Sequence, residues 1–290
     1  AAVTLGRLAR PLLRPRLRAM LVSTRPPGPA RTEQATRRML LLGGCVQDTL
    51  DPVTNAAARR VLARFGIALD AAPRAGCCGA LAWHLGEARA ARAQARANVD
   101  AWWPAIEAGG VEAIVSAASG CGVMLKDYGE VLAGDPAYAE KAARVSALAR
   151  DLAEVVAGEN YADLPRPGLV TRRVAFSCPC TLQHGERLAG TVEIILRRLG
   201  FDLAPVADPE QCCGAAGSYT LLNPAWADRL GDRKLEALTR GTPEIIATAN
   251  IGCQMHLQAR TPLPVRHWIE LLDARVDPLK TARASRAPGL

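Results

Sequence analysis

A pattern of cysteines occurs twice along this chain with nearly constant spacing. Aligning the Cys-Cys-Gly triplet at residues 77–79 with the triplet at 212–214 shifts the chain by 135 residues, and a shift of 132 aligns the last cysteine of each set. The aligned pairs are Cys45 and Cys180, Cys77 and Cys212, Cys78 and Cys213, and Cys121 and Cys253. Self-similarity at a fixed period is the signature of repeated structural units. We therefore expect two similar halves.

The segments between the cysteines repeat as well. Short apolar runs typical of buried strands alternate with segments of helical period, several of them closed by Gly. In the first half the predicted strands are 38–44, 67–73 and 112–119 and the helices 54–66 and 85–108, while in the second half the strands are 173–179, 201–207 and 244–250 and the helices 190–201 and 224–240. A last strand–helix pair is predicted at 144–156 and at 263–272. This alternation predicts an α/β fold, with a small parallel sheet flanked by helices in each half.

The repeated cysteine pattern and the composition of the segments around it predict the domain boundaries. A basic linker or N-terminal extension at 1–38 is followed by a first cysteine-rich domain at 39–157, a second at 170–275 and a tail at 276–290. The stretch 158–172, rich in Gly, Pro and polar residues, is predicted to separate the halves.

The net charge of +8 lies almost entirely in the first 38 residues, which hold nine arginines and one acid. The remaining acidic and basic side chains cancel, so no nucleic-acid partner is expected. We interpret the arginine-rich start as a connector from an upstream domain. The alternatives are an amphipathic segment on anionic lipid and the end of an import sequence. No apolar run reaches the length of a membrane span.

The cysteines of each half follow predicted strands. Parallel strands joined by right-handed crossovers place all their following loops at the carboxyl edge of the sheet. Each cysteine also precedes a predicted helix, whose N-terminus favours thiolate over thiol. We therefore expect four thiolates, from three loops, to meet in each half.

Three chemistries use such a set of thiols. A disulfide between adjacent residues is disfavoured, because neighbouring Cα atoms are about 3.8 Å apart, below the usual range for disulfides. Four thiolates suit structural zinc, although zinc sites usually space their cysteines by two to four residues. An iron–sulfur cluster also takes four cysteines, and adjacent thiolates reach two of its irons while Gly79 or Gly214 turns the backbone away. Iron–sulfur and zinc both remain open on spacing alone.

Three further residues stand near these sites. Cys178 adds a fifth thiol to the second half, two residues before Cys180. His184 and His256 follow Cys180 and Cys253, where each is a candidate to donate a hydrogen bond to a bound sulfur or to serve as an alternative ligand. Ordinary packing near the helix N-terminus is the alternative for both histidines.

The repeated pattern resembles the cysteine-rich CCG domain of heterodisulfide reductase B subunits, anaerobic glycerol-3-phosphate dehydrogenase C subunits, lactate-utilisation proteins and glycolate oxidase iron–sulfur subunits. In the second half, "FSCPCTLQHGERL", "CCGAAGSYTLLNP", "TPEIIATANIGCQMHLQ" and "VRHWIELL" are similar to the glycolate oxidase iron–sulfur subunits in particular. The resemblance covers residues 39–273.

The resemblance implies an iron–sulfur electron-transfer subunit of a glycolate dehydrogenase or oxidase. In that role the nine cysteines serve as cofactor ligands, with no catalytic residue on this chain. Electrons pass from a flavin-containing partner subunit to a membrane quinone or other acceptor. The expected cofactor is a [4Fe–4S]-type cluster in at least one half, with zinc as the alternative in the other. The expected location is the cytoplasm, with peripheral association at the inner face of the membrane also compatible.

The chain departs from the family pattern in two places. Ala118 and Asn250 stand where members with five-cysteine halves carry the first cysteine of a terminal C-x-x-C, so the five-thiolate cluster of those members is not implied here. The C-x₂-C-x₂-C-x₃-C-P run of two-cluster ferredoxins is also absent. The resemblance therefore implies that an N-terminal ferredoxin-like module is missing from this chain. The alternatives are another redox subunit of the CCG family, acting on lactate, glycerol 3-phosphate or a disulfide, and a zinc-stabilised binding or scaffold protein.

Overall fold

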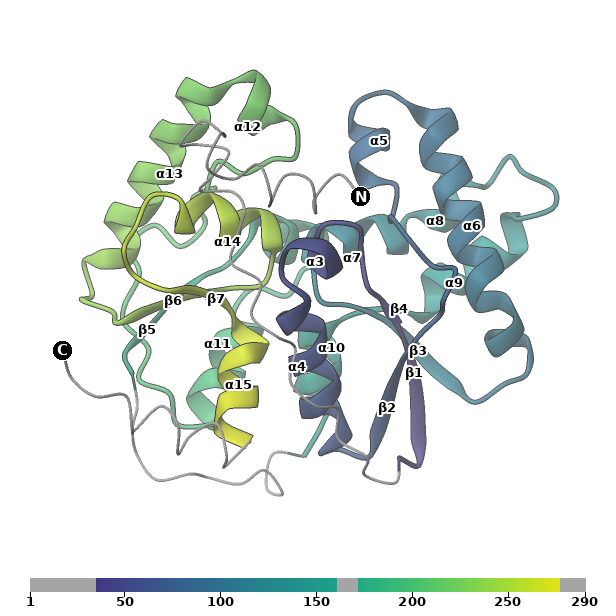
Figure 1. Cartoon of the computed structure of the whole chain (residues 1–290), viewed down its shortest axis with the longest axis horizontal. Coiled ribbons are helices and arrows are strands. Elements are labelled where there is room, and N and C mark those ends of the chain that lie inside the picture. The colour runs from purple at the N-terminus through teal and green to yellow at the C-terminus, as the bar shows by residue number, and fades with distance from the viewer. Residues whose placement is uncertain (1–34, 161–171, 277–290) are drawn as a thin grey trace.

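The structure is a computed structural model that describes residues 35–160 and 172–276 (Figure 1). The predicted tail, most of the basic extension and most of the segment between the halves lie outside these residues. Element labels follow Figure 1.

The first half contains four parallel strands in the order β2-β1-β3-β4. Its elements are β1 (Arg37–Leu42), α3 (Gln47–Leu50), α4 (Pro52–Ala63), β2 (Ile67–Ala71), α5 (Ala80–His84), α6 (Ala88–Glu107), β3 (Val111–Ser116), α7 (Ser119–Lys126), α8 (Tyr128–Val131), α9 (Ala139–Leu148), β4 (Ala149–Asp151) and α10 (Leu152–Ala157). Strand β1 thus begins two residues inside the segment predicted to be a linker.

The second half contains three parallel strands in the order β5-β6-β7. Its elements are β5 (Val174–Ser177), the π-helix η3 (Thr181–Gly185), α11 (Thr191–Arg198), α12 (Tyr219–Leu222), α13 (Pro224–Thr239), β6 (Ile245–Thr248), α14 (Ile251–Gln258), β7 (Val265–His267) and α15 (Trp268–Val276). The predicted α/β architecture, with two repeated parallel sheets flanked by helices, is confirmed.

The prediction of a full strand at 201–207 is wrong, because the paired segment is much shorter. Only one bridge forms there, between Leu203 and Val174, supported by hydrogen bonds of 2.8 Å to the Asp202 carbonyl and 2.9 Å from the Ala204 amide. Pro205 follows directly and has no N–H to continue the ladder. The bridge nevertheless lies beside β5, as β2 lies beside β1, so the two halves share one topology.

Helices from both halves form a layer between the two sheets (Figure 1). Helix α4 packs against α15, and α10 packs against α11, so each pair joins one helix of each half. The core around this layer is continuous from Leu41 and Val61 in the first half to Phe176, Leu196 and Trp268 in the second. Each half also has a smaller outer core on the far face of its sheet. The central core makes the two halves one packed body.

Buried polar contacts also cross between the halves. Arg60 on α4 pairs with Asp273 on α15 at 2.8 Å, and both side chains are only 4% exposed. The hydroxyl groups of Ser119 and Thr181 are 2.7 Å apart. The polar contacts fix the register of the helices that the apolar core holds together.

The last helix of each half begins at the same kind of cap. Asp151 accepts the Ala153 amide and Glu154 accepts the Asp151 amide, which forms a capping box at α10. At α15, His267 Nδ1 accepts the Ile269 amide at 3.3 Å. A histidine therefore replaces the capping carboxylate in the second half.

Candidate metal centre

Three loops of each half bring cysteines to the carboxyl ends of the strands. In the first half Cys45 follows β1, Cys77 and Cys78 follow β2, and Cys121 lies in the first turn of α7 after β3. The second half repeats this placement with Cys180, Cys212, Cys213 and Cys253. Figure 1 shows α5 and α12, which follow the two Cys-Cys-Gly triplets, on one side of the molecule above α7 and α14.

The thiols of the first half contact one another. Cys45 Sγ lies 3.4 Å from Cys77 Sγ. Hydrogen bonds with Cys77 and Cys121 raise the pKa of Cys78, together with its burial. Cys78 is buried, whereas Cys45 is exposed. The four thiols therefore form one connected set that extends from the interior to the surface.

The second half contains the same set. Cys213 Sγ lies 2.8 Å from Cys253 Sγ, and both residues are buried. A hydrogen bond with Cys212 raises the pKa of Cys180, which is exposed. The structure therefore brings the eight aligned cysteines together in two groups of four, as the sequence predicts.

Hydrogen bonds favour the thiolate form of one cysteine in each set. Hydrogen bonds from Cys45 and Cys78 lower the pKa of Cys77 to about 2, and the Gly79 amide points at the same sulfur at 3.5 Å. Hydrogen bonds from Cys180 and Cys213 likewise lower the pKa of Cys212 to about 2. Donors around a sulfur favour its charged form, which is the form that binds metals.

The glycine of each triplet is required by its backbone. Gly79 and Gly214 have φ angles of 93° and 85°, a left-handed conformation that side chains disfavour. A Cβ on Gly79 would lie 3.1 Å from the Ala91 carbonyl oxygen, and one on Gly214 would lie against the Ala227 carbonyl. The glycines let the chain turn away directly after the paired cysteines.

Cys178 packs in the central core, whereas Cys213 and Cys253 pack in the outer core of the second half. Its side chain is buried in the central core near Phe176 and Leu182, and burial raises its pKa to about 12. The charge of Cys253 still acts on it. Its assignment as a cofactor ligand stays a prediction.

The two histidines have different surroundings. His256 is buried, with Nε2 3.0 Å from the Ala227 carbonyl and Nδ1 3.3 Å from the Arg260 guanidinium. This arrangement makes Nε2 the donor and links α14 to α13. His184 is exposed in η3, four residues after Cys180. Their predicted hydrogen bonds to a bound sulfur are untested.

The donor set fits an iron–sulfur cluster, because each of four thiolates binds a separate iron. Four thiolates also satisfy the ligand requirement of zinc. Within residues 35–160 and 172–276, no three His, Cys, Asp or Glu side chains surround one point in a way that would hold a metal ion.

Exposed apolar side chains border both cysteine sites. On α5 and just after it they follow the first triplet, and on α12 and at the start of α13 they follow the second. They are Leu81, Trp83, Leu85, Tyr219, Leu221, Leu222 and Trp226, here called the apolar rim. A Cβ on Gly217 would lie 3.3 Å from Leu81, so the two parts of the rim adjoin.

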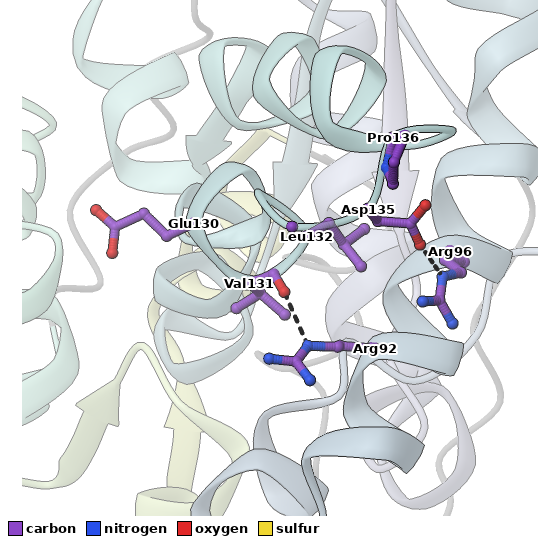
Figure 2. A pocket seen from close by; sticks show the side chains of 8 residues that line it. Arg92, Arg96, Glu130, Val131, Leu132, Asp135 and Pro136 are labelled. Atoms are coloured by element: carbon purple, nitrogen blue, oxygen red, sulfur yellow. Dashed lines mark hydrogen bonds and ion pairs between the residues drawn. The ribbon is translucent and has the colours of Figure 1, made fainter.

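A separate pocket of about 400 Å³ lies between α6 and the loop after α8 (Figure 2). Both arginines of the pocket form hydrogen bonds with its other lining residues. Arg92 donates to the Val131 carbonyl at 3.1 Å, and Arg96 donates to Asp135 at 2.6 Å. No cysteine lines this pocket. It is distinct from the candidate metal centre.

Comparison with known proteins identifies the repeat. The model of the cysteine-rich domain named CCG matches residues 39–126 and 174–258. The chain belongs to the CCG family. Each CCG match contains one complete set of four converging cysteines.

Several proteins are similar in sequence to this CCG protein. It is 48% identical over 281 residues to the glycolate oxidase iron–sulfur subunit of Escherichia coli, covering 96% of this chain and 68% of that protein. It is 27% identical to the probable glycolate oxidase iron–sulfur subunit of Bacillus subtilis, of which it spans 49%. It is also 27% identical to lactate utilization protein A of Geobacillus thermodenitrificans, of which it spans 96%.

A solved structure shares the fold of this CCG protein. A hypothetical protein from Helicobacter pylori superposes with a TM-score of 0.56 at 12% identity, over 88% of this chain and 52% of that one. In the described part of the chain, no helix combines the length and hydropathy needed to cross a membrane.

Proposed function

We propose that this chain is the iron–sulfur electron-transfer subunit of a multi-subunit glycolate dehydrogenase or oxidase. The observation that carries the proposal is the convergence of four thiols in each half, one of them stabilised as a thiolate. The names of the E. coli and B. subtilis relatives support the same function.

The ligands in this proposal are the eight aligned cysteines. A [4Fe–4S]-type cluster in at least one half supplies one-electron transfer, with zinc as the alternative in the other half. The protein holds the sulfurs in place through three loops fixed by the sheet. The Gly79 and Gly214 amides donate to Cys77 and Cys212, and such hydrogen bonds to ligating sulfurs are one of the factors that set cluster potentials.

The partners in this proposal are a flavin-containing subunit, which oxidises the 2-hydroxy acid, and a membrane quinone or other acceptor. The apolar rim is the surface we assign to the partner subunit. Leu222 and Trp226 are 71% and 59% exposed beside the second cysteine site. Covering such side chains by another subunit is favourable, and it brings that subunit next to the thiols. We place the complex in the cytoplasm, and peripheral association with the inner face of the membrane is also compatible with this function.

Lactate is the second candidate substrate of the complex. The chain spans nearly the whole of the lactate utilization protein A of G. thermodenitrificans, although at lower identity. Assay of the assembled complex with glycolate and with lactate separates the two. Faster dye reduction with glycolate is expected.

Anaerobic purification followed by iron, sulfide and zinc analysis and EPR tests the cofactor. Iron and sulfide are expected, and two zinc ions without iron would refute electron transfer. The double variant C180A/C213A is expected to lose the signal of the second half and C45A/C78A that of the first. The variant C178A keeps the eight aligned thiols, and a changed signal in it would show that Cys178 also binds the cofactor. Normal iron content and signals in C180A/C213A would show that these residues are not ligands.

A further inference from the structure

Helices α6 and α13 carry different side chains at equivalent places beside the two cysteine sites. The carbonyls of Ala91 on α6 and Ala227 on α13 each face the glycine of a Cys-Cys-Gly triplet. Seven residues after these alanines stand Asn98 in the first half and Lys234 in the second. The repeat therefore places a neutral amide in one half where the other has an amine.

The first half is neutral at this place. The Asn98 side chain accepts the Gly76 amide at 2.7 Å and donates to the Cys77 carbonyl at 2.8 Å. Tyr128 accepts a hydrogen bond from Asn98 and donates to the Cys78 carbonyl at 2.8 Å. These groups position the paired cysteines without adding charge.

The second half has a buried cation instead. Lys234 is 0% exposed, and its Nζ donates to the Pro209 carbonyl at 2.8 Å in the loop that leads to Cys212. Burying a charge is costly unless an opposite charge is near. No carboxylate in the described part of the chain forms an ion pair with Lys234, although the charge of Glu193 interacts with it. The negative charges that act on Lys234 are therefore those of Glu193 and of the thiols of the second site.

The electrostatic coupling of Lys234 supports this pairing. Burial lowers the pKa of the Lys234 amine, whereas the charges of Cys213, Cys178 and Cys253 raise it. The charge of Lys234 also lowers the pKa of Cys212, whereas the pKa of its counterpart Cys77 is set by the neighbouring thiols, by burial and by the Gly79 amide. The asymmetry between the halves is therefore one of charge as well as of sequence.

We propose that Lys234 makes the second cysteine site the one with the higher reduction potential. This rests on the proposed iron–sulfur function. Gaining an electron makes the site more negative, and a buried cation stabilises that charge more strongly than water-exposed groups do. Net charge and hydrogen bonding are the factors that set such potentials. Electrons that reach the first site therefore move on to the second.

A redox titration of the full chain tests the proposal. In the C77A/C78A background only the second site binds iron, and its midpoint is followed by EPR. K234Q keeps a donor but removes the charge, and its midpoint is expected to fall by at least 59 mV, a tenfold change for one electron. K234R keeps the charge and is expected to keep the midpoint. In the control R240Q, the lost charge lies in a solvent-exposed pair with Glu236 at the end of the same helix, where water screens it, so little shift is expected.

Each outcome decides the proposal. An unchanged midpoint in K234Q, or an equal fall in K234R, overturns it. If K234Q binds no iron, K234R decides: iron at the wild-type midpoint supports a role of charge, and loss of iron shows that packing alone is needed. A wild-type chain that binds no iron contradicts the proposed function itself, and this inference with it.

Discussion

The Gln254 side chain of the second half donates a hydrogen bond of 2.8 Å to the Asp51 carboxylate of the first, and both residues are buried. Gln254 directly follows Cys253, and Asp51 ends the short helix that follows Cys45. Each half therefore supports a cysteine loop of the other. Changes at the boundary between the halves are expected to affect both stability and the cysteine sites.

The Arg60–Asp273 pair is expected to stabilise this boundary. D273A leaves a buried guanidinium without its carboxylate, which costs about 3–5 kcal/mol in typical buried pairs. Urea unfolding measures the loss. The exposed pair Arg38–Asp70 provides the control, because D70A is expected to change stability by only about 0–1 kcal/mol. Equal effects of the two variants would contradict a special role for the buried pair.

Gly214 is expected to be indispensable for the second site. G214A combines a positive φ with a clash against the Ala227 carbonyl, so the loop carrying Cys212 and Cys213 must move. The expected result is loss of the iron of the second half, measured as iron per chain. Gly86 has a φ of 80° but no atom within 4 Å of a Cβ, so G86A controls for backbone strain alone. Full iron content in G214A would show that the turn is not needed.

Protonation of the buried His267 is expected to destabilise the folded protein in acid. Burial lowers the pKa of His267 to about 4, whereas an unfolded histidine titrates near 6.5. Its contribution is therefore complete above about pH 6.5 and is lost as the pH falls towards 4, by about 3 kcal/mol in total. H267N keeps a capping acceptor without the titration. Unfolding of both proteins between pH 4 and 7 measures the difference, and parallel pH profiles would refute the prediction.

Asp151, the equivalent cap of the first half, predicts the opposite trend. Burial raises the pKa of Asp151 to about 8, so the folded protein holds this proton more tightly than the unfolded chain does. Its contribution is complete below about pH 4 and is lost as the pH rises through 8. D151N is expected to be more stable than the wild type at pH 8.5. A smaller stability of D151N at that pH would show that the carboxylate is needed in its charged form.

Charged substitutions in the apolar rim are expected to weaken assembly with the partner subunit. L222D introduces a charge at the most exposed leucine of the rim, and it is expected to weaken association with the partner subunit in pull-down experiments while leaving folding intact. I194D is the matched control, because Ile194 is 49% exposed on α11, outside the rim. Weakening by I194D but not by L222D would place the partner elsewhere.

The sequence predicted the parallel sheets and the meeting of the cysteines, because apolar runs followed by Gly and Cys define strands and their carboxyl-end loops. It did not predict the helical layer between the sheets. Periodicity identifies the apolar face of α4 and of α15, but it does not say that each covers the other. The strand predicted at 201–207 is reduced to one bridge at Leu203, because Pro205 has no N–H to continue the ladder and an apolar run does not reveal this.

Lys234 was also missed, since lysines are expected at the surface. A signal did exist in the sequence. Ala227, Gly231, Lys234 and Leu238 fall on one face of α13 and are all buried, so the lysine occupies an apolar position of the helix. The sequence also did not predict the contacts of Asn98, because they depend on how α6 lies against the loop before Cys77.

The central helical layer has a consequence for any electron that passes through this protein. Because α4 and α10 are packed against α15 and α11 in one continuous core, neither half can swing away from the other without exposing that core. The spacing between the two cysteine sites is therefore constant. In the proposed function, the rate of electron transfer between the two sites is therefore not controlled by an internal hinge.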